Sequence, residues 1–351
     1  MLDYLVVGLG LAGTVFCEAL EEQGKTFHVV SDDSQQASLV AGGLYNPVIL
    51  KRFTMAWKAD EQMKIAIPFY KKLEKKLNAQ LDHTLPVLRR FASVQEQNLW
   101  FEAADKPGLE RFLSPRILEN DNPKIDAPFG FGQVLCTGWI DTETLIRTYA
   151  SYLYSKGTLT ERHFDFSGLK VADDFVSYKE LNARQVVFAT GYGLRRNPFF
   201  KYLPLNGTKG ELLKIKCLGL NEKSIIKSSV FIIPLGQDLY RVGATYKWKD
   251  KTHLPTEAAK AELLHKVRTF LKADFEVVDH VAGIRPTVAD RRPLVGRHPM
   301  HQRVYALNGF GSRGVLIGPY AANQLLGFIE KGTPLDTEMD IARFAKKYYT
   351  D

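Results

Sequence analysis

The sequence LDYLVVGLGLAG, at residues 2–13, joins a short apolar run to three closely spaced glycines. Residues 2–7 have the composition of a buried β-strand. The next stretch, TVFCEALEEQG at 14–24, places apolar side chains at helical spacing and ends on a glycine. TFHVV at 26–30 then predicts a second strand. A unit of strand, glycine turn, helix and strand therefore begins at the first residues.

The three glycines match the pattern G-x-G-x-x-G between a strand and a helix. In this pattern Gly8 allows the tight turn, Gly10 lets backbone approach a pyrophosphate, and Gly13 lets the helix pack closely on the strand. The unpaired N–H groups at the helix N-terminus would face the phosphates. An ordinary glycine-rich turn is the alternative. The predicted dinucleotide-binding residues of this turn are Gly8, Leu9, Gly10, Leu11, Ala12 and Gly13.

An acidic residue is expected about twenty residues after the glycines, where it would bind the ribose hydroxyls. The second predicted strand ends at Ser31, and Asp32 follows it. We predict that Asp32 binds the ribose and that Ser31 shares this task. The alternative is an exposed turn after the strand.

Composition and charge limit the class of protein. The chain has 351 residues, 45% hydrophobic and 25% charged, which is typical of a globular protein with two domains or two interleaved halves. No segment resembles a membrane span, and Asp3 in place of a basic flank argues against a signal peptide. Cys17, Cys136 and Cys217 are too far apart in sequence to predict a disulfide framework or a zinc site, so we expect a reduced, cytoplasmic protein.

The net charge of +8 fits an anionic partner such as RNA, or an anionic cofactor and substrate. The eight histidines show no spacing typical of metal ligands or of a Ser/His/Asp triad. We therefore expect no metal site.

Further along the chain, residues 55–78 predict a helix that is kinked or broken before Pro68. Residues 83–140 are β-like and rich in loop residues, and Asp141 is expected to cap a helix over 141–155. Strands are expected within 205–250 and a helix over 255–273. The chain has no repeats or flexible linkers, so its two halves are expected to be interwoven.

Two late segments return to the pattern of the first residues. A strand at 185–188 runs into Ala189, Thr190 and Gly191, and the strand VYALNG at 304–309 is followed by the glycine turn FGSRG and a helix. Two such segments closing on one permanently bound cofactor suit FAD better than NAD, although an NAD-dependent dehydrogenase remains the alternative. Small residues in SLVAGGLYNP, residues 38–47, would let backbone run close to a flat ring. The predicted ring-binding residues of that segment are Ala41, Gly42, Gly43 and Leu44.

Five motifs in the same order resemble the D-amino acid oxidase superfamily of flavoenzymes, which includes glycine oxidase and sarcosine oxidase. They are GLGLAG, the ATG at 189–191, VGATY at 242–246, GIRPTVADRRPLVG at 283–296 and NGFGSRGVLIGP at 308–319. Within the superfamily, the ending GSRGVLIGPYAANQLLGFIEKGTPLD resembles the FAD-dependent domain of bifunctional tRNA-modification enzymes of the MnmC type. The chain has no room for the methyltransferase half of such an enzyme, so we expect only the oxidoreductase module.

The resemblance implies a fold of mixed class, α/β plus α+β. A Rossmann-like FAD-binding domain, formed by residues 1–80, 140–200 and 280–351, would interleave with an antiparallel-sheet substrate domain, formed by residues 81–139 and 201–279. Covalent attachment of the flavin would need a cysteine near Arg285, and there is none. We therefore expect non-covalent FAD.

The resemblance also implies roles for particular side chains. Arg285, in the G-x-R-P motif, would bind the substrate carboxylate as a planar, bidentate clamp. An ion pair with Asp290 is the alternative. The loop before the last helix would wrap the flavin through Gly309, Gly311, Ser312, Arg313, Gly314 and Val315.

Several of these roles stay open. The side chain of Arg313 is assigned equally to substrate, flavin or a core salt bridge, and glycine oxidases tend to carry an arginine where Ser312 stands. Tyr246 and Tyr45 are candidates for the substrate cavity or for core packing.

The predicted function is oxidation of a carboxylate-bearing amine by hydride transfer to flavin N5, followed by hydrolysis of the imine. One candidate substrate is a free D-amino acid, glycine or sarcosine. The other is the carboxymethylaminomethyl group of a tRNA wobble uridine, which is also an N-substituted glycine. A non-catalytic nucleotide-fold protein that binds RNA or regulates another protein is the alternative of a different class.

Overall fold

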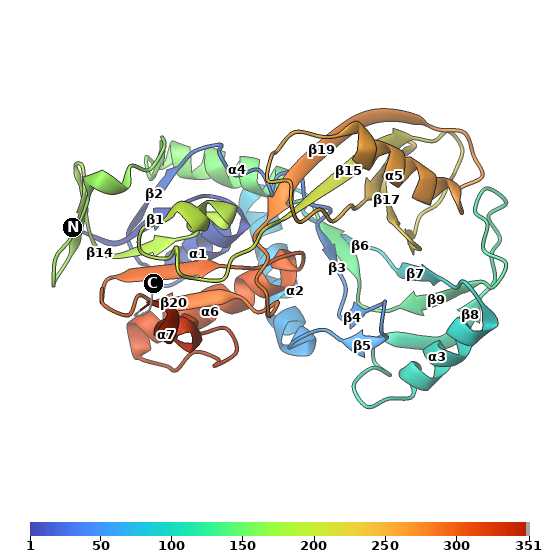
Figure 1. Ribbon diagram of the computed structural model, residues 1–351, viewed down its shortest axis with the longest axis horizontal. Coiled ribbons are helices and arrows are strands. Elements are labelled where there is room, and N and C mark those ends of the chain that lie inside the picture. The colour runs from blue at the N-terminus through green and yellow to red at the C-terminus, as the bar shows by residue number, and fades with distance from the viewer. Residues whose placement is uncertain (349–351) are drawn as a thin grey trace.

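The computed structural model describes residues 1–348 and has two lobes that lie side by side (Figure 1). One lobe contains both ends of the described chain and a largely parallel sheet. The other contains a largely antiparallel sheet. Helix α2 (Ala59–Leu77) and strand β3 (Leu44–Tyr45) lie between them. This arrangement confirms the predicted fold class.

Eight strands of the described chain form the first sheet. Strand β1 lies between β2 and β14 and is parallel to both, and β14 is also parallel to β21. Tyr4, Leu5, Val6 and Val7 are at most 2% exposed, as expected for a parallel strand that is covered on both faces. The strands are β1 (Leu2–Val7), β2 (Phe27–Ser31), β11 (Leu159–Glu161), β12 (Leu169–Val171), β13 (Val176–Tyr178), β14 (Leu181–Phe188), β20 (Leu294–Arg297) and β21 (Val304–Asn308).

Alternation along β1 divides the core of this lobe into two layers. Tyr4 and Val6 pack with the helices on one face, and Leu5 and Val7 pack with residues of β13, β14 and the segment that follows β14. The helices of the first face are α1 (Leu11–Glu22), α2, α4 (Thr142–Ser155) and α6 (Gly314–Lys331). Asp141 caps α4 as predicted, because its carboxylate accepts a hydrogen bond from the backbone N–H of Thr144.

Helix α2 continues through Pro68 from Ala59 to Leu77, so the predicted break is wrong and the kink stays a prediction. Pro68 removes one backbone donor from the helix. Packing of Ala66, Tyr70 and Leu73 in the core shared with α6 compensates for that loss.

The second sheet also has eight strands within the described residues, in the order β19-β15-β18-β17-β16-β7-β9-β8. Each neighbouring pair is antiparallel except β16 and β7, which run parallel. The strands are β7 (Val87–Arg90), β8 (Leu113–Leu118), β9 (Phe131–Val134), β15 (Thr208–Lys216), β16 (Ile225–Lys227), β17 (Phe231–Gly236), β18 (Leu239–Gly243) and β19 (Glu276–Arg285).

Two helices pack on this sheet. Helix α5 (Glu257–Arg268) falls within the predicted range 255–273, but α3 (Val94–Ala104) lies where only strands and loops were expected. The missed signal is a capping sequence at Ser93, whose hydroxyl accepts a hydrogen bond from the N–H of Glu96. The Glu96 carboxylate in turn accepts one from the N–H of Ala92.

Short elements complete the described structure. Strands β3, β10 (Gly138–Ile140) and β6 (Asp82–Thr84) form a small sheet, and β4 (Val48–Ile49) pairs with β5 (Thr54–Met55). The remaining elements are η1 (Phe166–Gly168), η2 (Gly191–Arg196), η3 (Ile341–Phe344) and α7 (Ala345–Tyr348).

The chain passes repeatedly between the two large sheets, so the lobes are interwoven as expected. The boundaries at 80, 140, 200 and 280 stay a prediction. None of the helices within residues 1–348 is long and apolar enough to cross a membrane.

Close backbone contact in the first glycine turn gives a test of this packing. A Cβ at position 13 would lie 2.0 Å from the carbonyl oxygen of Gly8, so Gly13→Ala must displace α1 from β1. We expect it to lower the free energy of unfolding by about 1–3 kcal/mol or more. Thermal unfolding measures this loss. Gly327→Ala in α6 is the matched control, because its Cβ would meet nothing closer than 3.9 Å and should leave stability unchanged or raised.

Candidate active site

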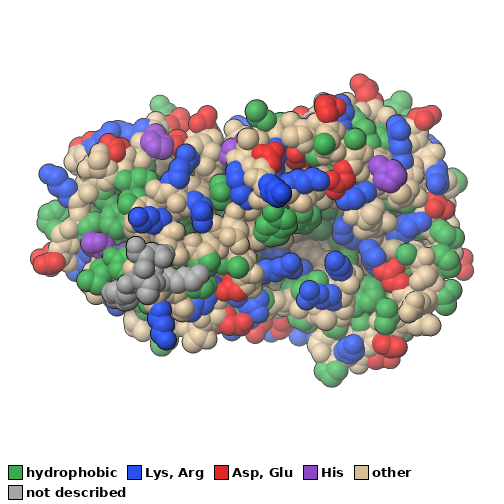
Figure 2. Space-filling model, viewed as in Figure 1, with side chains coloured by type: hydrophobic (Ala, Val, Ile, Leu, Met, Phe, Trp, Pro, Cys, Tyr) green, Lys and Arg blue, Asp and Glu red, His purple; other side chains and the backbone are tan. Residues whose placement is uncertain are grey.

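A cavity of about 1070 Å³ lies between the two large sheets. It opens where the parallel strands β1, β2, β14 and β21 reach their carboxyl ends, which is the usual position for a nucleotide in such sheets. Its other side is lined by residues of the second sheet, including Gly210, Leu212, Phe231 and Arg285. The molecule is hollowed between the two lobes, and Lys and Arg side chains gather along the rim of the hollow (Figure 2). The volume is at the upper end of the usual range for small-molecule sites, about 300–1,000 Å³.

The predicted glycine turn lies at one end of this cavity. Gly8 has a φ of +97°, and a Cβ there would lie 2.8 Å from the carbonyl oxygen of Ala189. Gly8, Leu9, Gly10, Leu11 and Ala12 line the cavity, and α1 begins directly at it. Gly13 is not among the lining residues, because it packs against Gly8 instead. The turn therefore presents backbone and the positive end of a helix to the cavity.

Two serine hydroxyls hold the turn in place. Ser31 Oγ accepts a hydrogen bond of 2.9 Å from the N–H of Leu9, and Ser38 Oγ accepts one of 3.0 Å from the N–H of Leu11. Ser31 was predicted to share the ribose contact with Asp32. In the structure its hydroxyl fixes the turn, and the contact with a ribose stays a prediction.

Asp32 lines the cavity just after β2. One carboxylate oxygen accepts hydrogen bonds from Ser34, and the other lies 2.7 Å from His163 Nδ1. Burial alone would raise the pKa of Asp32, but the bonds from Ser34 and His163 outweigh it and lower the pKa below its usual value. The carboxylate is therefore charged at neutral pH, and its contact with a ribose stays a prediction.

The segment after β14 forms another wall. Ala189, Thr190 and Gly191 line the cavity as predicted. Asn308, at the end of β21, donates a hydrogen bond of 3.0 Å to the carbonyl of Gly191 and accepts one from the N–H of Gly309. From the sequence, Asn308 was predicted only to belong to a strand. Its place directly before the glycine turn is the signal that points to this linking role.

The last predicted wall is the start of α6 together with residues 41–46. Ala41, Gly42, Gly43 and Leu44 line the cavity, as do Gly311, Ser312, Arg313, Gly314 and Val315. Gly309 does not line it; its φ is +77° and it packs against Val288 and Leu294. Arg313 Nη1 donates a hydrogen bond of 2.9 Å to the carbonyl of Asn46, so the two segments are joined.

The polar atoms along these walls fit a bound dinucleotide. Thr190 Oγ1, Gln35 Oε1 and Thr142 Oγ1 belong to cavity-lining residues and are buried without a hydrogen-bond partner in the described protein. Buried polar atoms are normally paired, so a ligand in the cavity would satisfy them. None of the three cysteines is among the lining residues.

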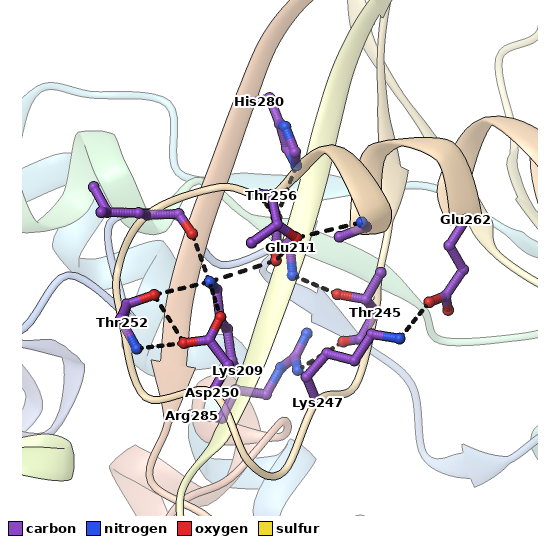
Figure 3. Close-up of polar contacts among 12 residues, drawn as sticks. Lys209, Glu211, Thr245, Lys247, Asp250, Thr252, Thr256, Glu262, His280 and Arg285 are labelled. Carbon is purple, nitrogen blue, oxygen red and sulfur yellow. Dashed lines mark hydrogen bonds and ion pairs between the residues drawn. The ribbon is translucent and has the colours of Figure 1, made fainter.

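Arg285 lies on the opposite side of the cavity, at the end of β19. Its Nη1 donates a hydrogen bond of 3.2 Å to the carbonyl of Thr245 (Figure 3). Its guanidinium also lies over the ring of Tyr246, 4.5 Å from the centroid. The alternative ion pair with Asp290 is not formed, since Asp290 pairs with Arg343. Within residues 1–348, no Asp or Glu pairs with Arg285 or with Arg313.

Tyr246 and Arg313 line the same cavity as Arg285. Each guanidinium donates a hydrogen bond to one backbone carbonyl, and that of Arg285 also lies over the Tyr246 ring. These neutral groups balance the positive charges only in part. Burial lowers the pKa of both guanidinium groups, which shows that their charge is poorly solvated. A buried charge without a partner is unfavourable, so an anionic ligand here would be stabilising.

Gly210 was not singled out from the sequence, yet it determines where Arg285 lies. Its backbone is directly below the guanidinium, and a Cβ at position 210 would lie 2.0 Å from Nη2 of Arg285. The signal is the register of two distant strands, in which Gly210 pairs with Gly283 and Thr208 with Arg285.

A buried polar network supports the backbone that Arg285 contacts (Figure 3). Thr245 Oγ1 accepts a hydrogen bond of 3.0 Å from the N–H of Glu211. Glu211 is 1% exposed and also binds Thr256 and lies 3.0 Å from His280 Nε2. Thr245 is thus fixed from the side away from the cavity.

Tyr45 does not belong to the cavity. Its ring is 3% exposed within the core, and its hydroxyl donates a hydrogen bond of 2.8 Å to Asp82. Leu44 lines the cavity instead, because neighbouring residues of a strand face opposite sides. Core packing, the alternative given above, describes Tyr45 correctly.

The comparison with known families identifies the chain. The model of the DAO family, described as FAD dependent oxidoreductase, matches residues 3–326. The chain belongs to the DAO family of FAD-dependent oxidoreductases. The alternative of an NAD-dependent dehydrogenase is therefore set aside.

Individual proteins match the chain either over a shorter length or at low sequence identity. Glycine oxidase from Bacillus subtilis is 31% identical over 144 residues, which are 39% of this chain and 38% of that protein. The tRNA 5-methylaminomethyl-2-thiouridine biosynthesis bifunctional protein MnmC from Aromatoleum aromaticum is 26% identical over 181 residues, 46% of this chain and 28% of that protein. The chain thus spans well under two thirds of the length of these curated relatives. Iminodiacetate oxidase from Chelativorans sp. BNC1 has the same fold, with a TM-score of 0.78 and 18% identity over 97% of this chain and 98% of that one.

Lys227 is a further cavity residue that sequence reasoning missed. It ends β16 and lines the cavity beside Phe231, and within residues 1–348 no carboxylate pairs with it. Burial, together with the positive charges of Arg89 and Lys266, lowers the pKa of Lys227 to about 8. No local motif marks it, because its direction depends on the order of strands in the sheet. Elsewhere, no cluster of His, Cys, Asp and Glu among the described residues could hold a metal ion.

Gly210→Ala tests the contact below Arg285. The new methyl group should move the guanidinium while leaving the nucleotide side of the cavity intact. We expect normal flavin content and a rise in KM for a carboxylate-bearing amine of about tenfold or more, since a hydrogen bond to a charged group contributes about 1.5–3 kcal/mol. Steady-state kinetics and the visible spectrum check this. An unchanged KM would contradict the proposed position of Arg285.

Lys227→Met tests the charge of the cavity. Because the folded pKa is about 8 and the unfolded value is 10.5, Lys227 lowers stability below pH 8, and this cost disappears as the pH rises towards 10.5. Its charge attracts an anionic substrate only below about pH 8. The ratio of KM in the variant to KM in the wild type should therefore be above one at pH 7 and should approach one above pH 8. Lys223→Met, at an exposed position nearby, is the control and should give a ratio near one throughout.

Proposed function

We propose that this FAD-dependent oxidoreductase oxidises a carboxylate-bearing secondary amine, an N-substituted glycine. The observation that carries the proposal is the pair of guanidinium groups, Arg285 and Arg313, that line one cavity without an acidic partner among residues 1–348. A planar guanidinium binds a carboxylate in a bidentate manner. Half-buried guanidinium groups that line a cavity without a carboxylate partner favour an anionic ligand.

FAD suits the opposite walls of the cavity. The turns at 8–12, 189–191 and 311–315 would hold it through backbone and helix N-termini, and Asp32 would bind the ribose. When bound, FAD supplies the acceptor for the hydride that leaves the α-carbon of the amine. Without covalent attachment, this binding rests on the surrounding backbone and on partners such as the Thr190 hydroxyl.

The residues of this chain would bind and orient the substrate. Arg285 fixes the carboxylate, and its contact with the Thr245 carbonyl and the Tyr246 ring limits its rotation. Orientation of two reacting groups can contribute several kcal/mol to a rate. The amine must bind in its neutral form, and the cationic surroundings of Arg285, Arg313 and Lys227 favour that form. The imine product then takes up water and yields a primary amine and glyoxylate.

A tRNA-borne carboxymethylaminomethyl group is the substrate that we favour over a free amino acid. The match to MnmC supports it, and so does the net charge of +8. Tyr246 lines the cavity and is nevertheless 57% exposed, so the cavity is open to solvent beside the clamp. An open rim accommodates a large substituent on the amine nitrogen. The widely spaced cysteines keep the prediction of a cytoplasmic protein.

Purified protein should be yellow and should lose its visible absorbance anaerobically with sarcosine or iminodiacetate, but not with N-methylethanolamine, which lacks the carboxylate. Arg285→Ala should retain FAD and lower kcat/KM by roughly 30- to 5,000-fold, because truncating one partner of a buried charge pair costs about 2–5 kcal/mol. Stopped-flow reduction of the flavin measures this.

Arg268→Ala, at an exposed position that ends α5, is the matched control and should behave as the wild type. Loss of FAD from Arg285→Ala would show that the arginine is structural. A colourless protein that takes up no FAD would favour the non-catalytic alternative.

A further inference from the structure

The loop between β18 and α5 exposes two aromatic side chains at the edge of the cavity. Tyr246 is 57% exposed and lines the cavity, and Trp248, two residues later, is 54% exposed and lies outside it. Tyr and Trp side chains are enriched at binding interfaces, where one end of the ring system is apolar and the other is polar. Trp248 does not line the cavity, so it takes no part in the oxidation of the amine itself.

The backbone of this loop is held firmly although its surface is exposed. Lys209 is 0% exposed, and its Nζ donates hydrogen bonds to Asp250 (2.6 Å), Thr252 (3.1 Å) and the carbonyl of Leu254 (Figure 3). Lys209 and Lys247 also exchange backbone hydrogen bonds of 2.9 Å in both directions. One buried ammonium group thus fixes several points of the loop, so Trp248 projects from an ordered backbone.

Basic residues surround the same loop. Lys251 donates hydrogen bonds to the carbonyls of Trp248 (2.6 Å) and Gly207 (2.7 Å) and lies 5.8 Å from the ring centroid of Tyr192. Tyr192 lies in η2, which also contains Arg195 and Arg196. Its position beside Lys251 brings η2 next to the loop.

Three basic side chains of the loop and of η2 are available for a partner. Arg195, Arg196 and Lys249 are exposed, and no carboxylate within residues 1–348 pairs with them. Arg196 also lines the cavity, so the positive charge continues from the surface to its rim. Burial, and after it the positive charge of Arg195, lowers the pKa of Lys251, so Arg195 lies close enough to Lys251 to affect it.

We propose that Trp248, Lys249, Arg195 and Arg196 form a docking surface for single-stranded RNA, whose modified base enters the cavity past Tyr246. This proposal rests on the tRNA-borne substrate proposed above and assigns residues to its recognition. Single-stranded nucleic acids are bound by aromatic faces that stack on bases and by basic side chains that neutralise phosphates. The surface offers both beside the opening through which the base would pass. An acidic peptide would use the charges but would leave the exposed indole face without a purpose.

The experiment measures binding of a fluorescein-labelled RNA hairpin with a seven-nucleotide loop to the FAD-loaded protein. Trp248→Ala should weaken binding on the order of tenfold, because stacking of one base contributes about 1–3 kcal/mol. Trp248→Phe keeps an aromatic face and should restore most of the affinity. Lys249→Glu should weaken binding and reduce the slope of log Kd against log salt concentration by about 0.7 or more. Lys71→Glu, on the exposed face of α2, is the charge-matched control and should bind as the wild type.

Flavin reduction by sarcosine or iminodiacetate is followed in parallel and should be unchanged in Trp248→Ala and Lys249→Glu. If these amines reduce the flavin but the hairpin binds equally to Trp248→Ala and the wild type, the docking surface is overturned and the oxidase function stands. If the hairpin binds as expected but neither these amines nor a tRNA that carries the carboxymethylaminomethyl group reduces the flavin, the proposed function fails instead. Equal binding of a fully paired RNA duplex, or of a polyglutamate peptide with the same loss in Trp248→Ala, would also overturn the proposal of single-stranded RNA.

Discussion

Direct contact between the backbone at Gly8, Gly13 and Ala189 positions the rest of the lobe that contains the parallel sheet. The carbonyl of Gly8 fills the space that a side chain at position 13 would need, and Ala189 leaves no room for a side chain at position 8. This contact brings α1 close to β1 and sets the end of β1 beside the end of β14. The helix N-terminus and two strand ends therefore meet at one point, which lies at one end of the cavity. Asn308 extends the same arrangement to β21 through the carbonyl of Gly191.

The opposite side of the cavity is organised by charge. Arg285 and Lys227 reach the cavity from the second sheet, and Arg313 reaches it from the start of α6. Asp250 and Glu211 belong to the network around Lys209, and the Lys209 ammonium lowers the pKa of Asp250 to about 2. Glu211 and Asp250 thus pair with the buried Lys209 and not with the cations that line the cavity. A negative ligand is the component that would balance this distribution.

Local sequence was sufficient where backbone constraints are local. The glycine turn, the ATG segment, the start of α6 and the cap at Asp141 follow from short patterns, and each was predicted at its position. The position of Tyr45 was harder to predict, because β3 has only two residues. The side to which each residue faces depends on the pairing of β3 with β10. Gly210 and Lys227 depend on strand neighbours far apart in sequence, so no motif marks them. Helix α3 is weakly amphipathic and short, and its capping sequence was its clearest signal.

The interweaving of the two sheets has a consequence for how the cofactor is acquired. Strand β14 receives β1 from the beginning of the chain and β21 from near its end, and α6 directly follows β21. No single continuous segment from the first part of the chain can complete either wall of the cavity. During synthesis, the glycine turn at 8–13 has to wait for residues beyond 304 before it faces a finished site. Stable retention of FAD would therefore mark the end of folding, and a chain that holds its flavin is one in which both lobes have closed.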